Sequence, residues 1–541
     1  MKVPYRGHGW LLHELHQGTC ELHNRATLTP LTARASGVLL PIFSLPSRFG
    51  IGDLGAYAYR FADSLLDAGQ TYWQVLPLNP PNARAFGSPY DCYSNFAGNP
   101  LLIDLAALAE EGLLTKEELE NAPDPSAVRI DYGQVTRFKM DLLAVASARF
   151  ARRDEQAEFE EFYRQQQYWL DDYALFMALT AEYPELSWTK WPAGLRDREP
   201  AALADARRSL AAAIEHWQIL QYFFFRQWRR LKSYCNEKGL LIFGDMPIYS
   251  NLESADVWAN SEIYQLDQDM RPTAVSGVPP DYFSPEGQLW GNPLYDWHEL
   301  ERQGFRWWVE RIGALFEIFD IVRIDHFRGL VQYWEVPVPC DSAMHGSWRQ
   351  APNQALFAAL KSAFPRFPVV AEDLGTITHD VAQARDQYQL PGMLVMQFAF
   401  VDDRSDNPHL PQNHRENSVI YFGTHDNNTA CGWLEEECGD AVRERLSRHV
   451  EFTEDKAEMV PRLLELVMSS RARTAIVCAQ DLLALPSRAR INVPGTTADN
   501  WSWLMSETEF ETIDWELLAA LSRRSGRHRA ARNIAEPIPS N

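Results

Sequence analysis

Four short apolar runs in this sequence end in charged residues. A carboxylate inside an apolar strand costs free energy unless it is paired or hydrogen-bonded. A structural ion pair explains any one of these clusters equally well, but four clusters at the same ends of four runs favour a shared polar pocket. The runs end in Asp245, in Arg323 with Asp325, in Glu372 with Asp373, and in His425 with Asp426.

The spacing of Arg323 and Asp325 assigns different roles to the carboxylates. Side chains alternate with a period of two along a strand, so these two residues lie on the same face. Arg323 can then hold Asp325 ionised, as a nucleophile requires. A general acid must keep its proton and needs a raised pKa. We therefore expect Asp325 to be a nucleophile and Glu372 a general acid.

The charged residues must be positioned by a repeating scaffold. Eight apolar runs alternate with segments of helical period, which is typical of an α/β fold in which helices cover a parallel sheet. Eight such strands predict a closed (β/α)8 TIM barrel, whose active sites lie at the carboxyl ends of the strands. The runs are residues 37–45, 72–78, 240–248, 321–327, 369–374, 393–400, 419–425 and 474–479.

Two of the intervening helices can be recognised from their apolar periodicity. Leu54, Ala58, Phe61 and Leu65 share one helical face, and Gly69 follows where that helix should end. Residues 305–319 form a second apolar stripe that leads into the fourth predicted strand.

Two long interruptions divide the chain. The gap between the second and third runs contains amphipathic stretches and predicts a large, mostly helical insertion after strand 2. A second insertion is rich in Pro, Gly, Asn, Asp and aromatic residues, which favours an ordered functional loop on the catalytic face and not a helix. We expect an N-terminal extension at 1–36, strands 1 and 2 at 37–104, the helical subdomain at 105–238, the rest of the barrel at 239–520 with the loop insertion at 249–302, and a flexible tail at 521–541.

Composition argues against several classes of partner. The formal net charge of −22 disfavours nucleic acid and anionic membranes and suits a neutral or cationic ligand. The N-terminus has no signal-peptide core, and no apolar run approaches the ~18 residues of a membrane-spanning helix. The seven cysteines are scattered without a CxxC pair, which favours reduced thiols in the cytoplasm. No metal-ligand spacing and no GxxxxGK or GxGxxG motif occurs, so we expect neither a metal nor an organic cofactor.

Four strings, in order, resemble the short sequence regions shared by the alpha-amylase superfamily. They are GDMPIY (244–249), VRIDHFRG (322–329), AEDLG (371–375) and FGTHD (422–426). Other strings are similar to glycoside hydrolase family 77, the 4-alpha-glucanotransferases known as amylomaltases or disproportionating enzymes. These are residues 40–47, GIGDLG (50–55), WQVLPL (73–78), SPY (88–90), FAGNP (96–100), the segment 277–297 and NVPGT (492–496).

The resemblance implies that Asp325 is the nucleophile, Glu372 the general acid and then base, and Asp426 a third carboxylate that holds sugar hydroxyls. It also implies ten substrate contacts. In the segment near residue 285, aromatic rings suit the apolar faces of glucose. One departure is Arg84-Ala85-Phe86-Gly87 before SPY, where many members have Gly-Tyr-Gly-Asp, and this puts a secondary glucan site in doubt. The implied contacts are Arg323, His425, Asp245, Ser88, Tyr90, Tyr282, Phe283, Gln288, Trp290 and Asn492.

The expected activity is transfer of alpha-1,4-glucan segments from maltooligosaccharides or starch to the 4-hydroxyl of another sugar, by a retaining double displacement. Three alternatives remain at this point. A hydrolase of the same superfamily would use the same carboxylates with water as the acceptor. A non-catalytic glucan-binding barrel should lack one of the three carboxylates, whereas all three are present here. A barrel enzyme that uses Mg²⁺ or Ca²⁺ would need further oxygen ligands near Asp325. Oligomeric state and preferred chain length are not specified by the sequence.

Overall fold

Eight parallel strands form the centre of the computed structural model, which describes residues 30–82, 87–123, 128–154, 156–280 and 286–529. Each of the eight predicted runs overlaps one of these strands, although β1, β10 and β11 begin one or two residues before the predicted run. They are β1 (Ala35–Leu39), β2 (Tyr72–Gln74), β3 (Leu241–Met246), β6 (Ile321–Ile324), β9 (Val369–Ala371), β10 (Gly392–Val395), β11 (Ser418–Tyr421) and β12 (Thr474–Cys478).

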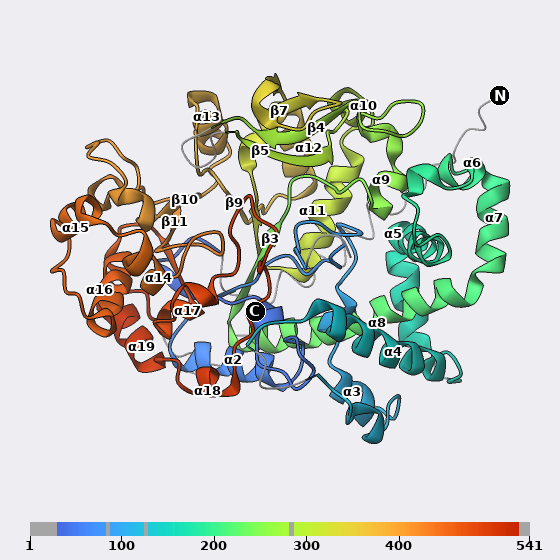
Figure 1. The fold of residues 1–541 in the computed structure, drawn as a ribbon, viewed down its shortest axis with the longest axis horizontal. Helices are drawn as coiled ribbons and strands as arrows, with labels where there is room; N and C mark the ends of the chain where they lie inside the picture. The colour runs from blue at the N-terminus through green and yellow to red at the C-terminus, as the bar shows by residue number, and fades with distance from the viewer. Residues whose placement is uncertain (1–29, 83–86, 124–127, 155, 281–285, 530–541) are drawn as a thin grey trace, which may run out of the picture.

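The sheet closes on itself. The hydrogen-bonded order is β10-β11-β12-β1-β2-β3-β6-β9, and every neighbouring pair is parallel. The two ends of this order meet where the amide of Ala371, the last residue of β9, donates to the Pro391 carbonyl before β10 at 2.9 Å. The predicted barrel is therefore confirmed (Figure 1).

The strands are buried on both faces, as parallel strands covered by helices must be. Inward-facing residues such as Leu39, Phe243 and Tyr421 pack together inside the barrel. Their alternate neighbours, such as Val38 and Ile242, belong to the larger core between strands and helices. This alternation explains why the runs are continuously apolar in sequence.

Helices follow the strands around the outside. The two helices predicted from periodicity are confirmed as α2 (Ala56–Asp67) and α11 (Arg306–Ile318), and Gly69 has the left-handed conformation that ends the first (φ 68°). The remaining helices of the barrel and of its C-terminal part are α12 (Asn353–Ala363), α13 (His379–Gln387), α14 (Ala430–Glu436), α15 (Asp440–Ser447), α16 (Lys456–Ser469), α17 (Ala479–Leu482), α18 (Glu507–Glu511) and α19 (Trp515–Arg524).

A helical insertion after β2 is present and lies to the right in Figure 1. It contains α3 (Leu105–Glu110), α4 (Tyr132–Phe150), α5 (Ala157–Glu182), α6 (Ala193–Arg196), α7 (Pro200–Ser209) and α8 (Ala211–Lys238). The helix α8 has two roles. It packs along α5, and its C-terminal half covers the barrel, where the Trp228 indole donates to the Ile318 carbonyl at 3.0 Å. The last helix of the insertion is thus also the barrel helix before β3.

The expectation for residues 249–302 needs correction. This segment was expected to be loop without helix, but it contains α9 (Ala255–Ala259) and α10 (Trp297–Arg302) and two strands, β4 (Ala274–Val278) and β5 (Gln288–Pro293). The two strands join β7 (Gln332–Pro337) and β8 (Ser347–Gln350) in an antiparallel sheet of order β5-β4-β7-β8, at the top of Figure 1. Because half of this sheet comes from the connection after β6, its pairing has no local sequence signal.

The expected flexible tail from residue 521 also needs correction as far as Arg529. The helix α19 continues to Arg524, and the side chain of Arg527 is buried. Its guanidinium donates to five backbone carbonyls at 2.7–3.0 Å, at the amino-terminal edge of β1 and after α16. The carbonyls belong to Ala35, Met468, Ser470, Ala472 and Arg473.

We expect Arg527→Met to lower the free energy of unfolding by roughly 2 to 4 kcal/mol, because buried carbonyls would lose their donors. Urea denaturation followed by circular dichroism measures the change. The matched control is Arg524→Met on the same segment, whose side chain is exposed and forms only a 3.6 Å ion pair with Glu465. The control should change stability by less than about 1 kcal/mol. Equal effects of the two substitutions would contradict the clamping role of Arg527.

Candidate active site

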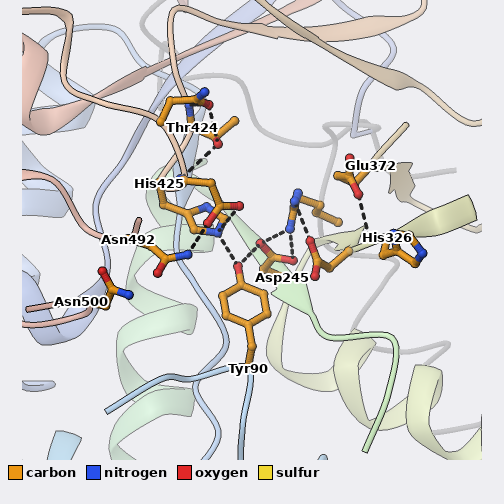
Figure 2. Close-up of polar contacts among 12 residues, drawn as sticks. Tyr90, Asp245, His326, Glu372, Thr424, His425, Asn492 and Asn500 are labelled. Carbon is orange, nitrogen blue, oxygen red and sulfur yellow. Dashed lines mark hydrogen bonds and ion pairs between the residues drawn. The ribbon is translucent and has the colours of Figure 1, made fainter. Parts of the chain in front are cut away.

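Apart from Asp373, the predicted charged residues gather at the carboxyl ends of four strands (Figure 2). Asp373 is buried and instead forms ion pairs with Arg385 and Arg415, so the expectation that it shares the pocket is wrong. Asp245 lies within β3 and Arg323 within the neighbouring β6, where the two residues are register partners. Asp325 follows β6 and Glu372 follows β9. His425 and Asp426 lie after β11. This is the face on which barrel enzymes build their active sites.

Arg323 is the centre of the charge network. Its Nη1 donates to both carboxylate oxygens of Asp245 at 2.9 and 2.8 Å, and its Nη2 contacts Asp325 Oδ1 at 2.7 Å. Arg323 and Asp245 are buried, whereas the Asp325 side chain is 31% exposed and open to a ligand. Burial lowers the pKa of Arg323, but Asp245 and Asp325 outweigh this effect and raise it well above its usual value. Arg323 is therefore a permanent cation beside Asp325.

Glu372 has a different environment. Its Oε2 accepts the His326 amide and its Oε1 accepts the Leu374 amide, each at 2.8 Å, so backbone groups fix the carboxyl group at both oxygens. Burial raises the pKa of Glu372 to about 8, and the charge of Asp325 adds to this while Arg323 opposes it. A carboxyl group that keeps its proton near neutral pH can protonate a leaving group.

Four residues contact Asp426 through its side chain or its backbone. Asn492 Nδ2 donates to Oδ1 at 2.7 Å, and His425 Nε2 lies 3.3 Å from Oδ2. The Asp426 amide donates to Thr424 Oγ1 at 3.2 Å, and Arg490 donates to its carbonyl at 2.7 Å. The Asp426 side chain is 36% exposed, so a ligand can reach it.

Tyr90 joins the two sides of the site. Its hydroxyl donates to Asp245 Oδ2 and also lies within hydrogen-bond distance of His425 Nε2, each at 2.9 Å. The rings of Tyr90 and His425 stack at a centroid distance of 5.5 Å. The structure therefore connects Tyr90, Asp245, Arg323, Asp325, His425, Asp426 and Asn492 in one chain of contacts.

The remaining described residues predicted to contact substrate lie outside this chain of contacts. Trp290 donates from its indole to Gln288 Oε1 at 3.2 Å and meets the His326 ring edge-to-face at 4.8 Å, next to the backbone that holds Glu372. Ser88 Oγ accepts the Tyr90 amide at 3.3 Å, so it stabilises the turn that carries Tyr90. Tyr282, Phe283 and the Arg84–Phe86 departure lie outside the described residues.

Four residues of the site were missed by the sequence analysis. His326 is part of the quoted string VRIDHFRG, and its position after Asp325 was a usable signal. Thr424 similarly lies inside FGTHD. Arg490 and Trp501 had no such signal, because their contacts are with distant segments. The Trp501 ring lies 5.5 Å from that of Tyr90 and 6.0 Å from that of His425.

The described residues meet neither the requirements of a metal site nor those of a membrane-spanning helix. Over these residues no group of three or more His, Cys, Asp or Glu side chains is arranged to hold a metal ion. None of the helices that the structure describes is both long and apolar enough to cross a membrane.

A closed barrel with a carboxylate cluster at the strand ends defines a barrel enzyme, and comparison with known proteins identifies its family. Residues 40–509 match the family model of glycoside hydrolase family 77, described as 4-alpha-glucanotransferase. The 4-alpha-glucanotransferase of Streptococcus pneumoniae serotype 4 is 44% identical over 481 residues, which cover 88% of this chain and 94% of that protein. The chain therefore belongs to the 4-alpha-glucanotransferase family, as the resemblance predicted.

Other relatives agree. The 4-alpha-glucanotransferase of Thermus thermophilus is 44% identical over 505 residues, covering 91% of this chain and 99% of that one. The structure of an amylomaltase from Streptococcus agalactiae in complex with acarbose superposes with a TM-score of 0.88 at 35% identity. That match covers 92% of this chain and 100% of the other.

The raised pKa of Glu372 predicts that the free energy of unfolding decreases as the pH rises. Its pKa is about 8 in the folded protein against an ordinary value of 4.5, so between these pH values the folded state binds more protons than the unfolded state. The stability that this proton contributes is complete below about pH 4.5 and is lost as the pH rises through 8. Glu372→Gln should therefore resemble the wild type near pH 5 and be more stable at pH 8.5, by roughly 2 to 4 kcal/mol.

Urea denaturation of both proteins at the two pH values measures this difference. Glu120, which is exposed, provides the control. The change in free energy of unfolding caused by Glu120→Gln should be the same at both pH values. A Glu372→Gln effect that is independent of pH would contradict the buried, protonated state of the carboxyl group.

Proposed function

We propose that this chain transfers alpha-1,4-glucan segments from a donor maltooligosaccharide or starch to the 4-hydroxyl of glucose or another glucan. The observation that carries the proposal is the contrast between two neighbouring carboxyl groups. Asp325 is paired with a permanent cation, and Glu372 is buried with a pKa raised to about 8. One group is suited to attack and the other to donate a proton. Family membership supplies the substrate class.

In the first step, an Asp325 oxygen attacks the anomeric carbon of the donor sugar. The bond from that carbon to the glycosidic oxygen breaks, and the oxygen takes the proton of Glu372. The donor's remaining reducing-end fragment departs with a free 4-hydroxyl. A glucosyl-aspartate with inverted configuration remains on the enzyme. Arg323 stabilises the carboxylate before attack and must release part of its charge interaction when the ester forms.

In the second step, the 4-hydroxyl of an acceptor attacks the same carbon, and Glu372, now ionised, takes the hydroxyl proton. The bond to Asp325 breaks and the alpha configuration is restored. The two backbone amides that hold Glu372 are compatible with both steps, because amide donors tolerate the ionised form while burial favours the neutral form. The exchange balances with the carboxyl groups of Asp325 and Glu372 and two sugars, so it needs no cofactor.

The surrounding residues are proposed to bind the sugar rings. Asp426 would hold hydroxyl groups of the sugar under attack, with His425 and Asn492 fixing its orientation. Tyr90, Asp245 and Arg323 form the adjoining polar wall, and Ser88 places Tyr90. Gln288 and Trp290, which lie beside His326, would contact the glucan on the Glu372 side. Tyr282 and Phe283 are proposed to bind the glucan on the resemblance alone.

A cytoplasmic location is part of the proposal. The six described cysteines are free thiols, and five of them are buried. Unpaired thiols persist in a reducing compartment. Linear alpha-glucans stored or degraded in such a compartment are the proposed donors.

We expect the pure protein to convert maltotriose into glucose and a ladder of longer maltooligosaccharides with little net gain of reducing ends. Transfer conserves the number of glycosidic bonds, whereas hydrolysis does not. Chromatography of the products and a reducing-end assay on the same samples measure both quantities. Asp325→Asn, which keeps the size of the side chain, should form neither glucose nor the ladder of longer products. Stoichiometric conversion to glucose and maltose would instead establish a hydrolase.

Glu372→Gln incubated with alpha-glucosyl fluoride should gain the mass of one glucosyl unit on Asp325. Fluoride leaves without an acid, so the first step proceeds, but the second step lacks its base. Intact mass spectrometry and peptide mapping measure the adduct, and the double variant with Asp325→Asn is the control. Labelling of Asp426 in place of Asp325 would show that the roles are assigned wrongly.

A further inference from the structure

A small cavity lies behind the segment that carries His425 and Asp426. It has space of about 10 Å³ for the centre of a water molecule, which is close to the least that one ordered water needs. On one side it is lined by Thr424, His425 and Asn427 of the loop after β11, and on the other by Gln480 and Asp481 of α17. Neither Asp426 nor its partner Asn492 lines this cavity, although His425 does.

Two oxygen atoms at this cavity, Gln480 Oε1 and Asp481 Oδ2, accept no hydrogen bond from the described residues. Gln480 Nε2 donates to the Ala489 carbonyl at 3.2 Å, which leaves the buried Oε1 as its free end. Asp481 is 3% exposed and accepts a single hydrogen bond, from the Ala430 amide at 2.7 Å. By contrast, the hydroxyl of Thr424 already contacts Asn427 Oδ1 at 3.0 Å. A buried amide oxygen with no donor, and a buried carboxyl group with a donor to only one of its two oxygens, each cost free energy.

The segment 478–481 also contacts both ends of the loop. At one end, the Cys478 thiol donates to the Gly423 carbonyl at 3.2 Å. At the other end, Asp481 holds the Ala430 amide, next to the start of α14. Between these two attachments the loop lines the cavity with Thr424, His425 and Asn427 and also carries Asp426. A bridge across the cavity would therefore fix the middle of the loop.

We propose that this cavity binds a water molecule that bridges Asp481 and Gln480 to the loop, and that Asp481 is a positioning residue for His425 and Asp426. A water has two hydrogens, which suits two unpartnered oxygen acceptors. A cation such as Na⁺ or Ca²⁺ fits less well, because it needs about six oxygen ligands and the described lining offers two that are free. Burial raises the pKa of Asp481 to about 7, and the neutral form would donate to the same water.

The catalytic part of this inference rests on the proposed function. Asp481→Leu keeps the branching and the number of side-chain heavy atoms but removes the hydrogen bond to Ala430 and the one proposed to the water, so the loop should shift and kcat for maltotriose transfer should fall roughly tenfold to hundredfold. The KM should change far less, because most of the polar wall remains. Asp481→Asn keeps an acceptor for the Ala430 amide and a polar group for the water, so it should recover most of the lost kcat.

The matched control is Asp514→Leu. Asp514 also accepts one backbone amide, from Leu517 at 2.8 Å at the start of α19, but Asp514 is exposed and α19 packs against α16 and α2. It should lower the melting temperature without changing kcat. Equal kcat in the wild type and in Asp481→Leu, or a loss that Asp481→Asn does not recover, would overturn the positioning role.

A high-resolution crystal structure of the wild type tests the water independently of activity. Electron density within hydrogen-bond distance of Asp481 and Gln480 Oε1 supports the proposal, and a collapsed cavity or a cation with six ligands overturns it. If the wild type transfers no glucan, the proposed function fails, while the crystal structure still decides whether the cavity binds water. If transfer is normal and the cavity is dry, only the present inference fails.

Discussion

A guanidinium group buried between two carboxylates is the constraint on which the site depends. Arg323 contacts Asp245 on the neighbouring strand and Asp325 beyond the end of its own strand. Taking such charges out of water is costly, and the cost is recovered only when the geometry is good and the remaining lone pairs are satisfied. The barrel provides that geometry because β3 and β6 are adjacent and in register. Tyr90 donates a further hydrogen bond to Asp245 Oδ2, which also accepts one from Arg323.

The same cation separates the chemistry of the two central carboxyl groups. Asp325 is in direct contact with Arg323, whereas Glu372 is held by two backbone amides and surrounded by protein. The two carboxyl groups therefore differ because Asp325 contacts the Arg323 guanidinium directly and Glu372 is more deeply buried. The difference does not come from the chemistry of aspartate and glutamate themselves. A barrel allows this because each strand can present its terminal residue at a different depth.

Much of this arrangement could be predicted from sequence. The eight strands are continuously apolar, and charged residues at their ends mark the site, so both are local patterns. The residues that were missed make contacts between distant segments. Trp501 lies against Tyr90 although more than 400 positions separate them. Arg527 falls in the tail that the sequence predicts to be flexible, and only the carbonyls around it, contributed by other segments, reveal that it is buried. The antiparallel sheet was missed because its strands come from two different loops.

The shared helix α8 bears on how such a chain can arise and fold. Its N-terminal half belongs to the insertion and its C-terminal half to the wall of the barrel, with no break between them. The insertion is therefore not a module that could be removed at its two ends, since cutting it out would also remove the cover of β3. Gain or loss of this subdomain during evolution would have to preserve one continuous helix of 28 residues. During synthesis, β3 leaves the ribosome only after the whole helix, so the insertion is complete before the third strand of the barrel can join the sheet.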